Sequence, residues 1–229
     1  MIFGRKRTLP DAKIESDPTD LPDDDNDEIS DQEEPDQWIA LDHSQDWRDD
    51  GPFDISEVDL SDDDVTRIDL GVLIVTPEKG MSIKLIAPAD TDQIMFMVVD
   101  NGQKSAAQIS VIAAPAMEDY CAQIRDDLIT SSEDAESTEL AIGPFGTELR
   151  RVMPIRDPQG QEVFLATRDW LIPGPRWVIS VRLTGQAAQN VGKYDDEFIE
   201  FVRNLIVRRG HQAMMPGAII ALTPDKPKA

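Results

Sequence analysis

The chain has 229 residues with 45 acidic and 22 basic side chains, which gives a formal net charge of −23 at pH 7. That length suits one domain of ordinary size with a tail. Because nucleic acids and anionic membranes are themselves negatively charged, the composition argues against a non-specific DNA or RNA binder and against broad membrane docking. No apolar run reaches 18 residues, and the basic start over residues 1–7 has no apolar stretch behind it. We therefore expect no transmembrane helix, no secretory signal and a cytoplasmic location.

The charge is distributed unevenly along the chain. Residues 8–50 contain 17 acidic side chains against two basic ones, and residues 1–64 together carry a net charge of −18. The apolar content of this region is too small to offset backbone ordering, which costs roughly 1–2 kcal/mol per residue. We therefore predict a disordered acidic arm over residues 1–50, a single α+β domain over residues 51–222 and a flexible tail over residues 223–229.

A few apolar side chains interrupt the acidic arm: Trp38, Ile39, Leu41 and Trp47. Short acidic and aromatic segments of this kind dock on partner proteins and fold as they bind. The alternative is that these side chains pack back onto the protein's own domain or stay free in solvent. Both alternatives remain open from the sequence.

From about residue 66 the hydrophobic pattern has a period of two, which is typical of strands. Alternation over residues 68–74 predicts a first strand, and further strands are expected over residues 81–87, 94–99 and 107–113. Asn101-Gly102 accepts positive φ at both turn positions and is the clearest hairpin signal in the chain.

The period then changes to that of a helix, and one stripe is formed by Met117, Tyr120, Cys121, Ile124 and Leu128. Strands follow over residues 138–142, 147–155, 162–172 and 177–183. A second apolar stripe over residues 194–205 predicts a second helix, and residues 218–222 suit a short strand. Hairpins and short turns dominate, so we predict an α+β fold with a largely antiparallel sheet and two packed helices. The order of elements resembles sandwiches of the Mog1/PsbP type.

Several short segments also resemble a known sequence family: Phe3-Gly4-Arg5-Lys6-Arg7, Gly51-Pro52-Phe53-Asp54, Arg67-Ile68-Asp69-Leu70-Gly71, Gly143-Pro144-Phe145-Gly146-Thr147-Glu148-Leu149, Gly174-Pro175-Arg176-Trp177 and Val207-Arg208-Arg209-Gly210. This looks like an uncharacterised actinobacterial domain family whose members pair an acidic N-terminal region with an α+β domain. The resemblance spans roughly residues 51–222. It implies a bacterial cytoplasmic protein, and it brings no activity, substrate or catalytic residues that can be carried over.

The residue types that carry chemistry are sparse. Cys121 lies on the apolar stripe of the first helix, where a free cysteine is usually a small buried hydrophobe. The two histidines, His43 and His211, stand in the arm and in the tail, so neither is an obvious partner for a reactive thiol. The aspartate runs over residues 23–25 and 62–64 do not match a calcium loop, and no phosphate-binding loop is present. We therefore expect no catalytic constellation, no metal site and no cofactor.

The cations between residues 145 and 185 are all arginines, and five of them are candidates for contact with an anion or a partner: Arg150, Arg151, Arg168, Arg176 and Arg182. Strand alternation places Arg151 on the face of Phe145, Leu149 and Met153, which should be buried. A buried guanidinium needs a carboxylate or phosphate partner. One interpretation is cross-strand ion pairing with the acidic residues nearby. The other is an anion site for the acidic arm, a partner's acidic segment or a phosphorylated small molecule.

These patterns favour an interaction or regulatory module without enzymatic activity, with an unknown protein as its partner. The alternative function is a small anionic-ligand binding domain that uses the arginine-lined face of the sheet. Binding of single-stranded nucleic acid is a third hypothesis, which the negative charge of the chain disfavours.

Overall fold

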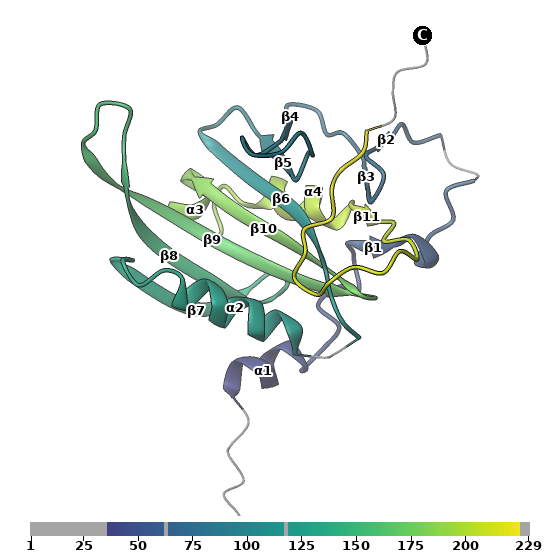
Figure 1. Cartoon of the computed structure of the whole chain (residues 1–229), viewed down its shortest axis with the longest axis horizontal. Helices are drawn as coiled ribbons and strands as arrows, with labels where there is room; N and C mark the ends of the chain where they lie inside the picture. Colours follow the sequence, from purple (N-terminus) through teal and green to yellow (C-terminus); the bar gives the residue numbers. More distant parts are fainter. Residues whose placement is uncertain (1–35, 62–63, 117–118, 225–229) are drawn as a thin grey trace, which may run out of the picture. The chain divides into compact units, whose positions relative to one another are not determined.

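Two sheets of different size organise the chain in a computed structural model that describes residues 36–61, 64–116 and 119–224 (Figure 1). In the larger sheet every neighbouring pair of strands is antiparallel, in the spatial order β4-β5-β6-β10-β9-β8-β7. Its strands are β4 (Ser82–Ile86), β5 (Phe96–Asp100), β6 (Ser105–Ala113), β7 (Ser137–Gly143), β8 (Gly146–Arg156), β9 (Glu162–Gly174) and β10 (Trp177–Gly185). Two meanders, β4 to β6 and β7 to β10, therefore join where β10 pairs with β6.

The smaller sheet gathers four short strands from both ends of the described chain, in the order β1-β11-β3-β2. They are β1 (Phe53–Asp54), β2 (Ile68–Asp69), β3 (Leu73–Val75) and β11 (Ile206–Val207). The single strand predicted over residues 68–74 is wrong, because the chain turns back on itself there and β2 pairs with β3. Gly71 has φ +81° and its N–H donates to the Asp69 carboxylate, so this glycine makes the turn.

Within the described residues, five helical segments complete the fold: α1 (Gln37–Asp42), a short 3₁₀ helix (Ile55–Glu57), α2 (Tyr120–Thr130), α3 (Gln186–Gln189) and α4 (Asp196–Arg203). The two predicted helices correspond to α2 and α4. The prediction for α2 began at residue 117, and residues 117–118 lie outside the described residues. The prediction for α4 ran too far, because the chain leaves the helix after Arg203 and pairs as β11 with β1 and β3.

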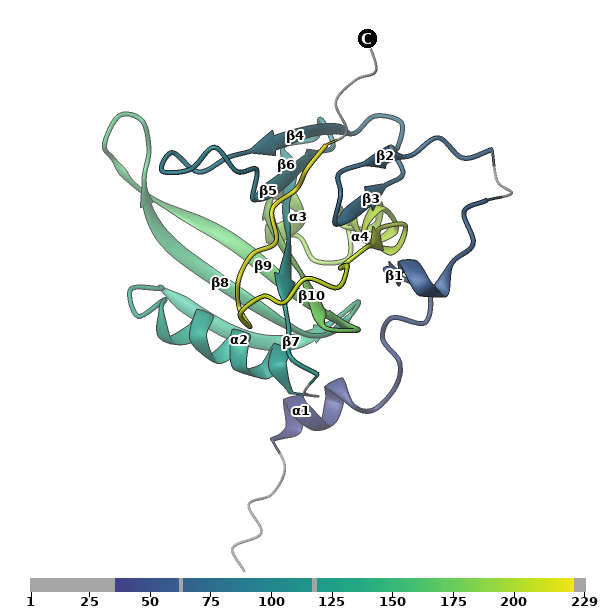
Figure 2. The ribbon, with the colours of Figure 1, turned by 45° about the vertical axis from the view of Figure 1, so that its right-hand side comes forward.

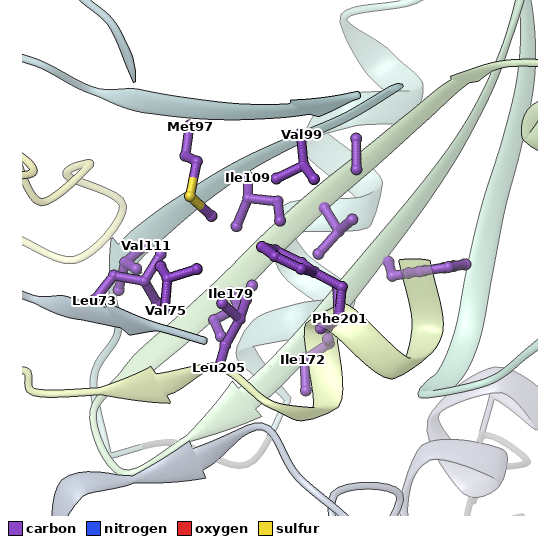
Figure 3. Close-up of a cluster of buried hydrophobic side chains, with 14 of the residues drawn as sticks. Leu73, Val75, Met97, Val99, Ile109, Val111, Ile172, Ile179, Phe201 and Leu205 are labelled. Carbon is purple, nitrogen blue, oxygen red and sulfur yellow. The ribbon is translucent and has the colours of Figure 1, made fainter. Parts of the chain in front are cut away.

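The two faces of the larger sheet are covered by different elements (Figure 2). Neighbouring residues of β10 face opposite sides of the sheet, since Ile179 packs in the main core and Val178 packs against α2. Figure 3 shows the main core, where Phe201 of α4 and Leu73 of β3 converge with side chains from β5, β6 and β10. Fully burying a side chain of this kind stabilises the fold by about 1.5–3 kcal/mol. The core therefore ties α4 and the smaller sheet to one face, while α2 covers the other.

The predicted α+β class with a largely antiparallel sheet is confirmed. The predicted strand at the C-terminus appears as two isolated bridges, Ile112 with Ile219 and Ile94 with Leu222. All the described residues belong to one compact unit that spans residues 35–229. No helix in the described part of the chain is long and apolar enough to cross a membrane.

Candidate functional site

Residues 36–50, which we call the strap, form an ordered segment against the domain. The helix α1 begins where the Asp36 carboxylate accepts a hydrogen bond from the Trp38 N–H at 2.8 Å, the usual role of an N-cap aspartate. It ends at His43. We expected residues 1–50 to be disordered, and the structure differs over residues 36–50 because this part is anchored on the domain. Residues 1–35 lie outside the described residues.

Asp42, the last residue of α1, makes the main anchor. Its Oδ2 lies 2.7 Å from Nη2 of Arg125 on α2, and its Oδ1 accepts the Thr147 N–H of β8 at 2.8 Å. Arg125 is only 3% exposed, so its charge is removed from water and needs this carboxylate. The Thr147 hydroxyl donates a further hydrogen bond to the Trp38 carbonyl at 3.1 Å. The domain thus presents a cation, an amide N–H and a hydroxyl to the strap.

The turn between β7 and β8 lets the strap approach closely. Gly146 has φ +96°, and a Cβ at this position would lie 2.8 Å from Asp42 Oδ1 and 3.5 Å from the Trp47 ring. A side chain here would therefore be strained and would also displace the strap. The segment Gly143 to Gly146 is thus a tight turn that also receives Asp42.

The four arm residues predicted as a docking motif lie on the protein's own domain. Trp38, Ile39, Leu41 and Trp47 are each half-buried. The Trp47 indole N–H donates to the Leu41 carbonyl at 3.0 Å, which folds the end of the strap back on α1. In this structure these four residues therefore pack on the domain that follows them in the chain.

A second anchor holds the C-terminal end of the strap. Arg48 forms two hydrogen bonds with Glu57, at 2.5 and 2.7 Å, and donates to the Pro52 carbonyl at 2.9 Å. The hydrogen bonds from Arg48 lower the pKa of Glu57 and outweigh the opposite effect of burial. The guanidinium also lies 5.5 Å from the centroid of the Trp177 ring. The strap is thus fixed at both ends.

A cavity of about 120 Å³ lies between the strap and the domain. Its lining residues come from the strap, from α2, from the turn before β8 and from β9: Ile39, Asp42, His43, Gln45, Asp46, Trp47, Arg48, Asp119, Cys121, Ala122, Phe145, Leu171, Ile172 and Pro173. At its mouth, His43 Nε2 lies 2.9 Å from Asp119 Oδ1, and both side chains are about half exposed. The cavity therefore depends on the strap for one of its walls.

Cys121 lies in this cavity wall and is 6% exposed. Burial raises the pKa of its thiol to about 12, and the opposing effect of Arg125 is smaller. The thiol is therefore protonated at neutral pH and is a poor nucleophile. The structure does bring His43 to the same cavity, a proximity that the sequence did not indicate, but it pairs His43 with Asp119.

Two of the candidate arginines surround Glu148, which is 0% exposed. Arg168 binds both of its carboxylate oxygens, at 2.9 and 2.7 Å, and Arg150 approaches Oε1 at 2.6 Å. The Trp170 indole N–H donates to Oε2. Arg168 also reaches Asp195, before α4, at 2.6 Å. Two arginines and two carboxylates thus neutralise each other between the sheet and the α3–α4 segment.

Two further candidates share Asp169 on the opposite face of the sheet. Arg151 Nη2 and Arg182 Nε lie 2.6 and 2.7 Å from its two oxygens, and Arg151 also donates to the Ser132 hydroxyl at 2.6 Å. The predicted burial of Arg151 is therefore found, together with a carboxylate partner. Phe145, which we placed on the same face, lies in the turn before β8 and packs on Trp170 instead.

The arginines therefore do not gather into one open face. Four of them are paired with carboxylates of the chain on two sides of the sheet, and Arg176 is exposed in the turn before β10 with φ +62°. Cross-strand pairing accounts for Arg151 and Arg168 without any ligand. That these residues contact an external anion stays a prediction.

The residues that hold the strap were missed by the sequence reasoning. Arg125 lies four residues after Cys121 and three before Leu128, so helical periodicity did place it on the buried stripe of α2. Asp42 had no such signal, because it is one of 45 acidic residues. Of the aspartate runs considered for metal binding, residues 23–25 and 62–63 lie outside the described residues. The described residues contain no group of three or more side chains suited to hold a metal ion.

Comparison with known proteins gives one sequence family and three distant structural likenesses, two of which are described here. A crystal structure from Bacteroides thetaiotaomicron VPI-5482 has 13% identity and a TM-score of 0.36, over 63% of this chain and 47% of that one, so the chain spans about half the length of that protein. The solution structure of cyanobacterial PsbP (CyanoP) from Synechocystis sp. PCC 6803 has 9% identity and a TM-score of 0.34, over 62% of this chain and 92% of that one. No curated protein matches the chain.

The sequence family is described as "Protein of unknown function (DUF3710)", and its match covers residues 51–229. The match begins directly after the strap, so Arg125, Gly146 and Thr147 lie inside the matched region and Asp42 lies outside it. The resemblance stated from the sequence is confirmed as a family of unknown function: the chain belongs to the DUF3710 family.

Proposed function

We propose that this chain is a non-enzymatic interaction module, in which the strap occupies a docking site that also receives a short acidic segment of a partner protein. The docking site consists of Arg125, Gly146 and Thr147. The observation that carries the proposal is the reception of Asp42 by a buried guanidinium and a backbone N–H. Such charge-assisted hydrogen bonds recognise a carboxylate and not merely an apolar side chain.

The strap has the properties of a segment that can be exchanged. The helix α1 has no fully buried residue, and its Trp38 and Leu41 are only half-buried. The apolar contribution to the docking of α1 is therefore small, and the free energy of this contact rests mainly on Asp42, while Arg48 holds the other end of the strap. A partner that offers a carboxylate on a short helix with neighbouring aromatic side chains would make the same contacts.

The internal pairing of the arginines weakens the case for the alternative, an anionic-ligand domain. Arg151 and Arg168 would each have to leave a carboxylate within 2.6–2.7 Å to receive an external anion. We also infer that Cys121 is not a catalytic nucleophile, because burial raises the pKa of its thiol and keeps it protonated. A cytoplasmic location is part of the same proposal and is tested by fractionation of the cells that produce the protein.

The proposal is tested with the full chain and a fluorescent peptide that reproduces residues 36–50. In the wild-type protein the strap competes from an effective concentration in the millimolar range, so the free peptide should bind poorly. Replacement of Asp42→Asn in the protein weakens the strap and leaves the docking site intact. We expect the wild-type peptide to bind this variant at least about tenfold more tightly than the wild-type protein.

Two controls make the outcome specific. A peptide with Asp42→Asn should bind the variant at least about tenfold more weakly than the wild-type peptide does. Replacement of Arg125→Met in the Asp42→Asn protein should remove binding of the wild-type peptide, with circular dichroism and urea unfolding used to check that the fold persists. Equal binding of the two peptides, or no binding of either, would contradict an exchangeable docking site.

A further inference from the structure

The cavity under the strap has room for one small ring and is lined in part by apolar side chains. Its floor is apolar and comes from the domain, through Phe145, Leu171 and Ile172, while Ile39 and Trp47 of the strap cover it. Its volume of about 120 Å³ compares with the cavity of about 150 Å³ that accepts a benzene molecule in another protein. One aromatic ring is therefore the largest group that fits fully inside.

The charges at the mouth of the cavity select the sign of a ligand. Among the lining residues that the structure describes, Asp42, Asp46 and Asp119 are acidic and Arg48 is the one arginine or lysine. Arg48 is paired with Glu57 and Asp42 is paired with Arg125, and both of these partners lie outside the lining, so Asp46 and Asp119 remain. The mouth is thus negative on balance, and an anion would be repelled.

Asp46 and Asp119 are the two carboxylates best placed to meet a cation. Asp46 Oδ1 accepts the backbone N–H of Arg48 at 3.0 Å, a donor without formal charge. Asp119 contacts His43, and its side chain stays about half exposed. A carboxylate in such a position can receive an ammonium group while the apolar part of the ligand is buried. The Trp47 ring adds an aromatic wall that favours a cation nearby.

We propose that this cavity binds a small aromatic ammonium ion, with the ring on the apolar floor and the ammonium between Asp46 and Asp119. The inference goes beyond the exchange of the strap, and binding itself does not depend on a protein partner. It does have a consequence for the strap. Because the ligand touches both the strap and the domain, it binds the docked state and stabilises it by mass action.

Benzylamine is a suitable probe, since it is a benzene ring with one ammonium group at neutral pH. Binding to the full chain is followed by chemical shift changes in NMR spectra, with benzyl alcohol and benzoate as the neutral and anionic counterparts. We expect benzylamine to bind at least about tenfold more tightly than benzyl alcohol and benzoate not to bind. Equal affinity for the three probes, or no binding of benzylamine at millimolar concentration, overturns the proposal.

Matched variants locate the site. Ala122 lines the cavity, so Ala122→Phe, or the smaller change Ala122→Met if the first disturbs the fold, should remove binding. The double replacement of Asp46→Asn and Asp119→Asn should remove the preference for benzylamine over benzyl alcohol. Asp126→Asn, an exposed change on the same helix that does not line the cavity, should have no effect. Binding that survives Ala122→Phe and Ala122→Met alike would place the ligand elsewhere and contradict the proposal.

The failure of this proposal can be told from the failure of the proposed function. Benzylamine should slow the reaction of Cys121 with methyl methanethiosulfonate at least about threefold at saturation, because the thiol lies in the cavity wall. The peptide experiment does not use the cavity ligand. Peptide binding without benzylamine binding would support the docking site and contradict the cavity proposal. Benzylamine binding without peptide binding would support the cavity proposal and contradict the exchangeable docking site.

Discussion

Arg125 and Asp42 lie 83 positions apart in the sequence and form an ion pair of 2.7 Å between α2 and α1. The two sides of the pair differ in exposure, since the Arg125 side chain is 4% exposed and that of Asp42 is 23% exposed. The guanidinium is part of the domain surface that the strap covers. When the strap undocks, water can reach Arg125, so the guanidinium is not left buried without a partner. Breaking this pair therefore costs no more than the free energy of strap docking.

Asp42→Asn should open the strap without unfolding the domain. A hydrogen bond to a charged group contributes about 1.5–3 kcal/mol, so the open population should rise about 10- to 100-fold. Cys121 is the single cysteine of the chain and lies under the strap, so its rate of reaction with methyl methanethiosulfonate should rise by the same factor. Asp49→Asn, an exposed change within the strap, is the control and should leave the rate unchanged. Equal rates in the two variants would exclude Asp42 as the anchor.

Gly146→Ala should loosen the strap through a different contact. Both Gly146 and Gly160 have positive φ, so alanine at either position should cost about 1 kcal/mol of unfolding free energy. A Cβ at Gly146 would also meet Asp42 Oδ1 at 2.8 Å, whereas a Cβ at Gly160 meets nothing within 4 Å. We therefore expect only Gly146→Ala to speed the reaction of Cys121 with methyl methanethiosulfonate. Urea unfolding should show a lower unfolding free energy in both variants. A faster reaction in Gly160→Ala as well would point to general loosening of the fold.

Glu148→Gln should be among the most destabilising polar substitutions in the chain. It removes the charge that Arg168 and Arg150 share, and it leaves the buried Arg168 guanidinium short of a partner. Loss of one partner in a buried pair costs about 3–5 kcal/mol. Urea unfolding measures the change, and Glu139→Gln on the exposed edge strand β7 should stay within about 0.5 kcal/mol of the wild type. A small change at Glu148 would mean that the cluster is far more hydrated than the structure shows.

Asp195 should make part of the stability dependent on acid. Burial alone would raise the pKa of this carboxyl, but its hydrogen bonds with Arg168 and with the Gly192 N–H outweigh burial, so the pKa is lowered. A lowered folded-state pKa stabilises the fold above the ordinary aspartate value of about 3.9, and the contribution is lost as pH falls through the lower folded value. Urea unfolding at pH values from neutral to below that range should show the loss. In Asp195→Asn the unfolding free energy should be lower at neutral pH and depend less on acid, and an unchanged dependence would contradict the assignment.

Sequence patterns predicted the parts of the fold that follow from local periodicity. Alternation along β8 placed Arg151 on a buried face, and the need of a buried guanidinium for a carboxylate is met by Asp169. The turn at Gly71 was not predicted, because the apolar residues on both sides of it continue the same alternation. The hydrogen bond from its N–H to Asp69 ends the strand there.

The strap shows why the candidate site was only partly predictable. Its apolar residues are too few to form a core, so composition favoured disorder. Arg48 holds one end of the strap through Glu57. The α1 end is held by one carboxylate, that of Asp42, which finds Arg125 and Thr147, and both lie more than 80 residues away in the sequence. No local pattern singles out Asp42 among its acidic neighbours. Arg125, in contrast, could have been recognised as a buried charge on the stripe of α2 that lacked a partner.

Native-state hydrogen exchange of the Thr147 amide tests the account most directly, because this N–H donates to Asp42 Oδ1. The amide of Ile179, a fully buried residue of the central strand β10, serves as the reference for global unfolding. We predict that Thr147 is protected, that it exchanges through an opening with a lower free energy than Ile179, and that Asp42→Asn lowers that free energy further while Ile179 is unaffected. A Thr147 amide that exchanges only with global unfolding would make the strap an integral part of the domain, and one without protection would mean that the strap is not docked.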